Sequence, residues 1–259
     1  MDEVADELTK LDIPFNVQEN RIRDTFRCFP HVVNIAVKAG IKALHDLSLY
    51  DYDAFAKPDA DVVSKARKLI NAIRSSGQRR EAFGNTIKAQ NDKGGWGEDP
   101  QILRIVGLLR DVDTRWSSTL IMIDRLLELY MAVNEFIYSP QQEKELAPFA
   151  LDEATYRALI DVRKFLQFLN TVQEIVSGQQ TPTLSVVLPL YEKLITGLRF
   201  LMTPGNEESI PKLSHAIHAT IEKLEEYFNK SRYTKMYALA MGKPPSYLRS
   251  AVIETYDKF

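Results

Sequence analysis

The sequence predicts a mainly α-helical bundle, and two patterns carry that prediction. Apolar side chains recur at steps of three and four residues after about the first thirty residues, which is the spacing of one helix face. Strand-like alternation of apolar and polar residues is almost absent. No internal repeat of fixed period is apparent, so the helices form one succession along the chain.

The periodic segments are expected to form helices in this order: residues 32–47, 62–73, 119–137, 152–177, 182–202 and 210–228, followed by a short apolar stretch at 233–241. Asp152 can accept free backbone N–H groups at a helix start, and Gly178 is expected to end that helix. Pro182 suits the first position of the next helix, whereas Pro189 is expected to kink it. The glycine-rich loop at residues 91–97 predicts a seam near residues 91–100.

Composition places the chain among globular proteins, since 45% of its residues are hydrophobic and 26% are charged. Its single cysteine, Cys28, excludes an internal disulfide framework and fits a reducing compartment. The acidic N-terminus does not resemble a secretory signal, and no apolar run approaches the roughly 18 residues of a membrane span. We therefore expect an intracellular protein with no membrane partner.

The near-neutral charge hides a basic segment in the first half of the chain. In total 33 Lys and Arg face 35 Asp and Glu, which gives a net charge of -2. Residues 62–93, however, carry eight basic residues against two acidic ones, Glu81 and Asp92. Such a run is either a solvated helix face or a patch for nucleic-acid phosphates. From charge alone the solvated face is favoured.

Metal and nucleophile chemistry receives little support from the residues. Cys28 and His31 form one possible ligand pair and His215 and His218 another, but no spacing rule for zinc links pairs so far apart. Cys28 as a nucleophile beside His31 lacks an identifiable orienting group or oxyanion site. No glycine-rich phosphate loop is present. We therefore expect neither a zinc site nor a cysteine hydrolase.

Trp116 follows Arg115 in a segment rich in hydroxyl side chains. It is either a half-buried tryptophan at a helix start that Ser118 or Thr119 caps, or an aromatic platform for an unstacked base or a phosphate. The residues alone leave both interpretations open.

Three ordered motifs resemble the hAT superfamily of cut-and-paste DNA transposases, especially copies abundant in mushroom-forming fungi. They lie at residues 27–35, which include Cys28-Phe29-Pro30-His31, at residues 72–80, and at residues 109–119, which include Asp113-Thr114-Arg115-Trp116. Residues 181–192 and 237–241 also look like downstream helices of that superfamily, so the resemblance covers nearly the whole chain.

The resemblance implies a piece of a larger enzyme. Members have a zinc-binding finger, a ribonuclease-H-like core with an Asp, Asp, Glu triad that binds two divalent metals such as Mg²⁺, a helical insertion, and a dimerisation region. Two such metals activate the attacking oxygen and stabilise the leaving one. Against that template the chain falls between the second Asp and the Glu. Residues 1–50 are then a remnant of the core and residues 51–259 the helical insertion, with no catalytic residue and no cofactor on this chain.

The resemblance also assigns roles to matched positions. His31 corresponds to a histidine beside the active site near the flanking DNA, Trp116 to a tryptophan that stacks on a displaced base, and Arg115 to its phosphate-facing neighbour. An insertion at residues 24–26 and the turn at residues 242–245 depart from the pattern, which indicates a decayed or domesticated copy.

Two functional hypotheses follow. The first is a catalytically inactive, nuclear transposase remnant with a DNA-facing surface built from seven residues, Arg27, His31, Arg74, Arg79, Arg80, Arg115 and Trp116. The second is a helical protein–protein scaffold that touches no DNA and associates with itself or with a full-length transposase. Its apolar faces at residues 120–137 and 184–198 would lack the missing core and seek partners.

Overall fold

The computed structural model describes residues 29–46, 61–98, 101–112, 115–177, 187–205 and 209–232. Within these ranges the chain is helical and has no strand; two isolated β-bridges, Trp96 with Gln101 and Val112 with Arg115, are its only sheet-like pairings. The mainly α-helical class predicted from the apolar spacing is therefore confirmed. No helix among these residues is long and apolar enough to cross a membrane.

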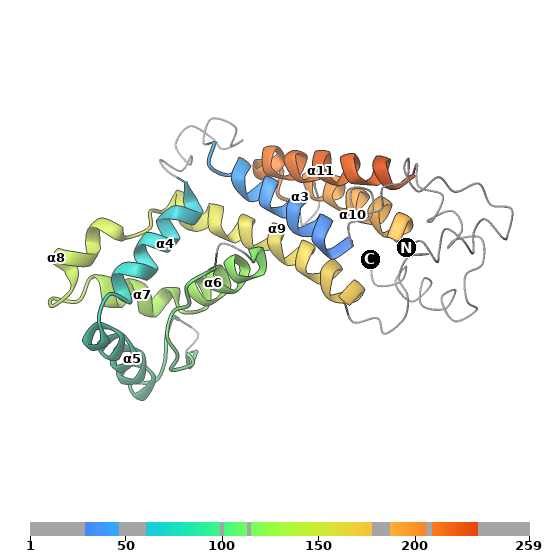
Figure 1. Cartoon of the computed structure of the whole chain (residues 1–259). Helices are drawn as coiled ribbons and strands as arrows, with labels where there is room; N and C mark the ends of the chain where they lie inside the picture. Colours follow the sequence, from blue (N-terminus) through green and yellow to red (C-terminus); the bar gives the residue numbers. More distant parts are fainter. Residues whose placement is uncertain are drawn as a thin grey trace, which may run out of the picture.

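The helices form two groups that share the long helix α9 (Glu153–Ser177) (Figure 1). The first group combines α9 with three other helices, α3 (Phe29–Ala43), α10 (Val187–Met202) and α11 (Ser214–Arg232). The second group contains the shorter elements, α4 (Val62–Ile73), α5 (Gly77–Asp92), α6 (Trp116–Glu128), α7 (Tyr130–Ile137), α8 (Glu143–Leu146) and the 3-10 turn η2 (Ala147–Phe149). A further 3-10 turn, η4 (Pro211–Leu213), leads into α11.

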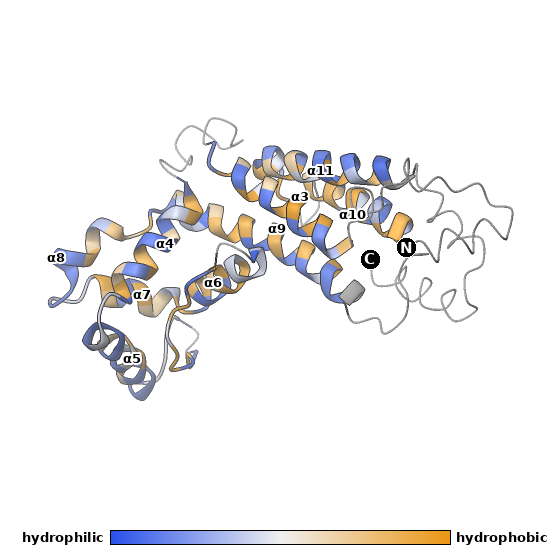
Figure 2. Cartoon of the chain, in the orientation of Figure 1, coloured by the Kyte–Doolittle hydropathy of each residue, from blue (hydrophilic) through white to orange (hydrophobic). Residues whose placement is uncertain are grey.

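The first group is held by the close approach of α3 and α11. Gly40 makes this possible, because a Cβ there would lie 2.2 Å from the Thr220 hydroxyl oxygen on α11. Aromatic contacts extend the core to α10, where the Tyr191 ring meets Phe29 edge-on at 4.9 Å and Phe228 at 5.7 Å. In Figure 2 the apolar residues of these helices lie on the faces that turn toward one another.

The second group packs α4 and α6 against α9 and α5 against α7. On α9 the predicted cap is present, since the Thr155 N–H donates to the Asp152 carboxylate at 2.7 Å. The same carboxylate accepts a hydrogen bond from Lys65 of α4 at 2.6 Å. Asp152 therefore both starts α9 and ties the short helices to it.

Most helix predictions agree with the structure, and the differences have local causes. The expected helix at residues 119–137 is two helices, because the chain turns at Leu129 between α6 and α7. Pro189 is the third residue of α10 in the range that the structure describes, Val187–Met202. Helix α5 was not predicted, because only Phe83 and Ile87 of its side chains are buried.

The glycine-rich loop at residues 91–97 starts at the end of α5 and is not an open linker. Gly94, Gly95 and Gly97 have positive φ angles, which let the chain fold back on α5. The Asn91 side chain then binds both the Trp96 indole N–H, at 3.0 Å, and the backbone of Leu103. These hydrogen bonds therefore hold the start of the segment at residues 101–112 against the end of α5.

The apolar faces that were expected to seek partners are largely covered. Buried residues of the two predicted faces include Leu120, Ile123, Leu126, Val133, Phe136, Leu190, Leu194 and Leu198. The premise of the scaffold hypothesis was therefore wrong for these faces, because α9, α5, α3 and α11 of the same chain already pack against their helices.

Candidate nucleic-acid interface

Three arginines from two elements and a loop lie close together, and we call Arg74, Arg80 and Arg110 the arginine cluster. Arg74 is the C-cap of α4, and Arg80 lies in the first turn of α5 and donates to the Arg74 carbonyl at 3.2 Å. Burial lowers the pKa of Arg74, and the positive charges of Arg110 and Arg80 lower it further. The cluster is therefore a concentration of like charge that an anion would relieve.

Arg110 lies in residues 101–112, which join α5 to α6 in the chain and which we call the connecting segment. This segment contacts both α4 and α6. Arg74 donates a short hydrogen bond to the Leu108 carbonyl of this segment. Nearer its end, Asp111 accepts three hydrogen bonds from Arg67, at 2.6, 2.9 and 3.2 Å, and one from Thr119 at 3.0 Å. The segment therefore runs antiparallel to α4, with Arg110 held between two anchored residues.

Asp111 is the central anchor of this arrangement. Its side chain is only 8% exposed. Burial raises the pKa of the Asp111 carboxyl, but the hydrogen bonds and charge of Arg67 and the hydroxyl of Thr119 outweigh that effect, so its pKa lies below the usual value. The carboxylate therefore stays ionised and joins α4, the connecting segment and α6.

Two members of the arginine cluster are exposed and have no carboxylate partner among the described residues. Arg80 and Arg110 are exposed, and neither forms an ion pair with any residue in the part of the chain that the structure describes. Arg115, just beyond the connecting segment, is likewise exposed and unpaired within those ranges. These three guanidinium groups are not neutralised by a described carboxylate, and apart from the bond from Arg80 to the Arg74 carbonyl their donors can bind phosphate.

Arg79, which was predicted to face DNA, is instead a structural residue. Its guanidinium forms an ion pair with Glu145 and donates to Gln142, to the Ala72 carbonyl and to Ser75. Only 18% of its side chain is exposed. Because these bonds tie α5 to α8 and to the end of α4, phosphate binding would have to break them.

Trp116 is buried, with 3% of its surface exposed. It begins α6, but neither Ser118 nor Thr119 caps that helix: Arg115 is the N-cap residue without a side-chain bond, and Ser118 bonds the backbone of Val112 instead. In this structure the indole is therefore part of the core and offers no platform for a base. Stacking on a displaced base stays a prediction, and it would require the ring to leave the core.

His31 lies far from the arginine cluster. Phe29, two residues earlier on α3, packs on Tyr191 of α10, whereas Arg74 ends α4 in the other helix group (Figure 1). Arg27 and Cys28 lie outside the described residues. The seven residues predicted to form one surface therefore do not form one, because helix packing separates His31, buries Trp116 and pairs Arg79. Arg110 was missed, since its position depends on the pairing of its neighbour Asp111 with Arg67.

Metal-binding chemistry is not evident among these residues. Within the described ranges, no three His, Cys, Asp or Glu side chains are grouped so that they could hold a metal ion. His215 lies partly inside the first helix group, where burial lowers its pKa and the charge of Asp46 raises it less. No metal-dependent step is assigned to the described residues.

Residues 26–153 match the family model described as the ZBED1 RNase-like helical domain. The match includes α3 to α8, the connecting segment and the whole arginine cluster. It supports a hAT-like, transposase-derived helical region. No curated protein and no solved structure matches the chain.

Proposed function

We propose that the chain is a hAT-type, transposase-derived protein that binds DNA through the arginine cluster. The observation that carries the proposal is the juxtaposition of Arg74, Arg80 and Arg110, two of them exposed and unpaired among the described residues, within the region that matches the transposase-related family model. Arg115, further along the chain, is also exposed and forms no ion pair among the described residues. Guanidinium groups bind phosphate with two parallel hydrogen bonds, which suits this placement.

The proposed binding tolerates different DNA sequences. No described feature presents a helix with base-reading side chains, whereas arginines that contact phosphates position a protein without reading sequence. The proposal further places the protein in the nucleus, assigns it to the element type abundant in mushroom-forming fungi, and gives it no catalytic carboxylates and no cofactor. These finer points are supported by the order and spacing of the three transposase-like motifs, at residues 27–35, 72–80 and 109–119.

The test is DNA binding by fluorescence anisotropy over a range of salt concentrations. For duplex DNA, log K falls with log salt by roughly 0.9 per phosphate neutralised, so the double variant Arg80→Ala/Arg110→Ala should have a slope smaller by about 1.8. The control variant Arg157→Ala/Arg199→Ala also removes two exposed arginines, but from α9 and α10. It should keep the wild-type slope.

Two outcomes would contradict the proposal. One is that the wild-type chain does not bind single-stranded, duplex or hairpin DNA at low salt. The other is that the control variant loses as much affinity as the cluster variant, since the effect would then come from net charge alone.

A helical scaffold that associates with itself or with a full-length transposase is the second candidate. Its support is the exposure of Ile102 and Ile105 on the connecting segment, at 67% and 56%. Sedimentation distinguishes the two candidates. A dimer whose mass and stability do not change when DNA is added would favour the scaffold.

A further inference from the structure

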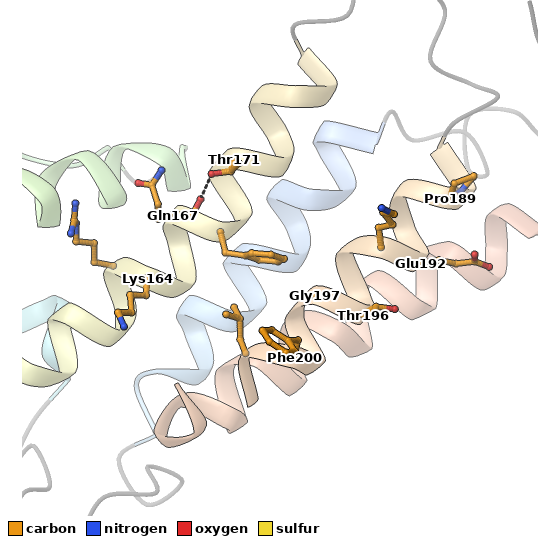
Figure 3. A pocket seen from close by; sticks show the side chains of 12 residues that line it. Lys164, Gln167, Thr171, Pro189, Glu192, Thr196, Gly197 and Phe200 are labelled. Carbon is orange, nitrogen blue, oxygen red and sulfur yellow. Dashed lines mark hydrogen bonds between the residues drawn. The ribbon is translucent and has the colours of Figure 1, made fainter. Parts of the chain in front are cut away.

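The groove between α9 and α10 is basic, but its charges already interact within the chain. It has a volume of about 890 Å³, with Lys164 on its α9 wall and Lys193 on its α10 wall (Figure 3). Both lysines have interactions with other residues of the chain. In the arginine cluster, by contrast, Arg80 and Arg110 are exposed and have no carboxylate partner among the described residues. The cluster, and not the groove, is therefore open to an anionic ligand.

The Arg80 guanidinium lies beside the first turn of α5. One of its terminal nitrogens, Nη1, donates to the Arg74 carbonyl at 3.2 Å. The other, Nη2, lies 3.9 Å from the position that a Cβ on Gly77 would take. Because Gly77 is the first residue of α5, the Arg80 charge lies where the helix dipole is already positive. An anion that binds Arg80 therefore also meets the start of α5.

Two backbone N–H groups at this helix start have no hydrogen-bond partner among the described residues. The Ser76 hydroxyl accepts from the Arg79 N–H at 3.1 Å, and the Ser76 carbonyl accepts from the Arg80 N–H at 3.2 Å. The N–H groups of Gly77 and Gln78 remain, and both residues are exposed. These two groups add donors to the guanidinium groups of the cluster, which form the site.

Arg74 supplies a third charge that no described carboxylate neutralises. Its Nη1 atom donates to the Leu108 carbonyl of the connecting segment, whereas its Nε atom is buried and has no hydrogen-bond partner among the described residues. Burial lowers the pKa of Arg74, the charges of Arg110 and Arg80 lower it further, and no described carboxylate raises it. A bound anion would therefore relieve the repulsion among the three arginines.

A phosphate monoester suits such a concentration of charge better than a phosphodiester does. Near pH 7 a monoester carries about 1.5 to 2 negative charges and three oxygens that accept strong hydrogen bonds. A phosphodiester within a strand carries one charge, and duplex DNA spreads these charges along its axis at one per strand for about every 3.4 Å. Three guanidinium groups at one place therefore match a single group that carries nearly two charges.

We propose that the arginine cluster binds the terminal phosphate of a DNA strand, a phosphate monoester, in preference to the phosphodiesters within the strand; this rests on the proposed function that the cluster binds DNA. Arg80 and Arg110 bind the phosphate oxygens directly, with the two N–H groups of the α5 start beside Arg80. Arg74 positions both of them, because its carbonyl holds Arg80 and its guanidinium holds Leu108 in the segment that carries Arg110.

The test compares DNA strands that differ only in a terminal phosphate. Fluorescence anisotropy with the full-length chain gives the Kd for one sequence that ends in a 5′-phosphate or a 5′-hydroxyl, and for the same sequence that ends in a 3′-phosphate or a 3′-hydroxyl. The DNA is single-stranded or duplex, whichever the wild-type chain binds more tightly. One additional charge-assisted hydrogen bond corresponds to about tenfold in Kd, so the phosphate should tighten binding about tenfold at one end or at both.

Two double variants show where the terminal phosphate binds. Arg80→Ala/Arg110→Ala should reduce the Kd ratio between hydroxyl and phosphate ends to nearly one. Arg157→Ala/Arg199→Ala removes the same amount of charge from α9 and α10 and should keep the wild-type ratio. Circular dichroism of each variant confirms that the helices are intact.

Gly77→Pro tests the helix start without changing any charge. Proline has no N–H and suits the first helical position. Ser76 already has the extended backbone that a following proline requires, with φ −136° and ψ 163°. Gly77→Pro should therefore lower the Kd ratio by roughly threefold while urea unfolding shows no loss of stability. A full ratio in this variant would remove the helix start from the site.

Equal Kd values for phosphate and hydroxyl, at both ends of the strand, overturn the proposal. It is also overturned if Arg80→Ala/Arg110→Ala keeps the wild-type ratio, or if the control variant loses it, since net charge would then explain the preference. The strands that end in hydroxyl groups test the proposed function separately. If they bind and the ratio is one, only this inference fails; if no strand binds at low salt, the proposed function itself fails.

Discussion

Gly40 offers the most direct test of how the first helix group is packed. Alanine favours a helix over glycine by about 1 kcal/mol, so helix propensity alone predicts that Gly40→Ala stabilises α3. In the structure, however, a Cβ at this position would lie 2.2 Å from the Thr220 hydroxyl oxygen and 3.0 Å from the Ala216 carbonyl oxygen. Thr220 is fully buried and bonds that same carbonyl at 2.9 Å, so it has little room to move.

We therefore expect Gly40→Ala to destabilise the protein. Overpacking a close contact costs about 1–3 kcal/mol, which exceeds the gain in propensity. Gly84 is the matched control: it is also helical, but a Cβ there meets nothing within 4 Å. Gly84→Ala should therefore raise the free energy of unfolding by about 0.5–1 kcal/mol. Urea unfolding followed by circular dichroism measures both changes.

A double variant separates the clash from other effects. Thr220→Ala removes the nearest atom, so Gly40→Ala/Thr220→Ala should lose less stability than the sum of the single variants, with a coupling of about 1–2 kcal/mol. If Gly40→Ala were as stable as the wild type, or if the two changes were additive, the close approach of α3 and α11 would be refuted.

Two further predictions concern the candidate interface. Because Trp96 and Trp116 are 5% and 3% exposed, tryptophan fluorescence should be blue-shifted and resist iodide quenching, and added DNA should not change it; strong quenching by DNA would show that Trp116 leaves the core. Asp111→Asn should lower the free energy of unfolding near neutral pH by about 1–3 kcal/mol, since it weakens a largely buried pair with Arg67. Because the folded-state pKa of Asp111 is lowered, its contribution is present above the unfolded pKa of about 3.9 and is lost as the pH falls through the folded pKa. The difference between wild type and Asp111→Asn in urea unfolding should therefore shrink toward acid pH, and a difference that grows there would contradict the assignment.

The sequence predicted helices well where one face of the helix is apolar and buried, because apolar residues then recur every three or four positions. Asp152 was expected to start a helix, and its carboxylate caps α9 in the structure. Helix α5 escaped prediction because it contacts the rest of the molecule mainly through Phe83 and Ile87, so most of its surface carries no periodic signal. The turn at Leu129 between α6 and α7 was not predicted, because apolar residues continue through it at helical spacing without a break.

The candidate site was harder to predict because it depends on which charges meet in space. Arg79 and Arg80 are neighbours in the sequence, and both belong to the basic segment at residues 62–93. Folding places Arg79 against Glu145 of α8, 66 residues later, and leaves Arg80 beside Arg74 and Arg110. No local pattern distinguishes the two, because the carboxylate that decides between them lies on a different helix.

A near-neutral protein can therefore present a cationic surface through selective pairing of its arginines. Arg67, Arg125 and Arg163 each face a carboxylate in the fold, so their attraction for phosphate is largely cancelled at short range. Asp111 both neutralises Arg67 and fixes the segment that carries Arg110 outward. The ion pair with Asp111 cancels the charge of Arg67, and the same pair holds the segment that carries Arg110. Asp111 therefore contributes to the basic surface, although its own negative charge opposes DNA binding.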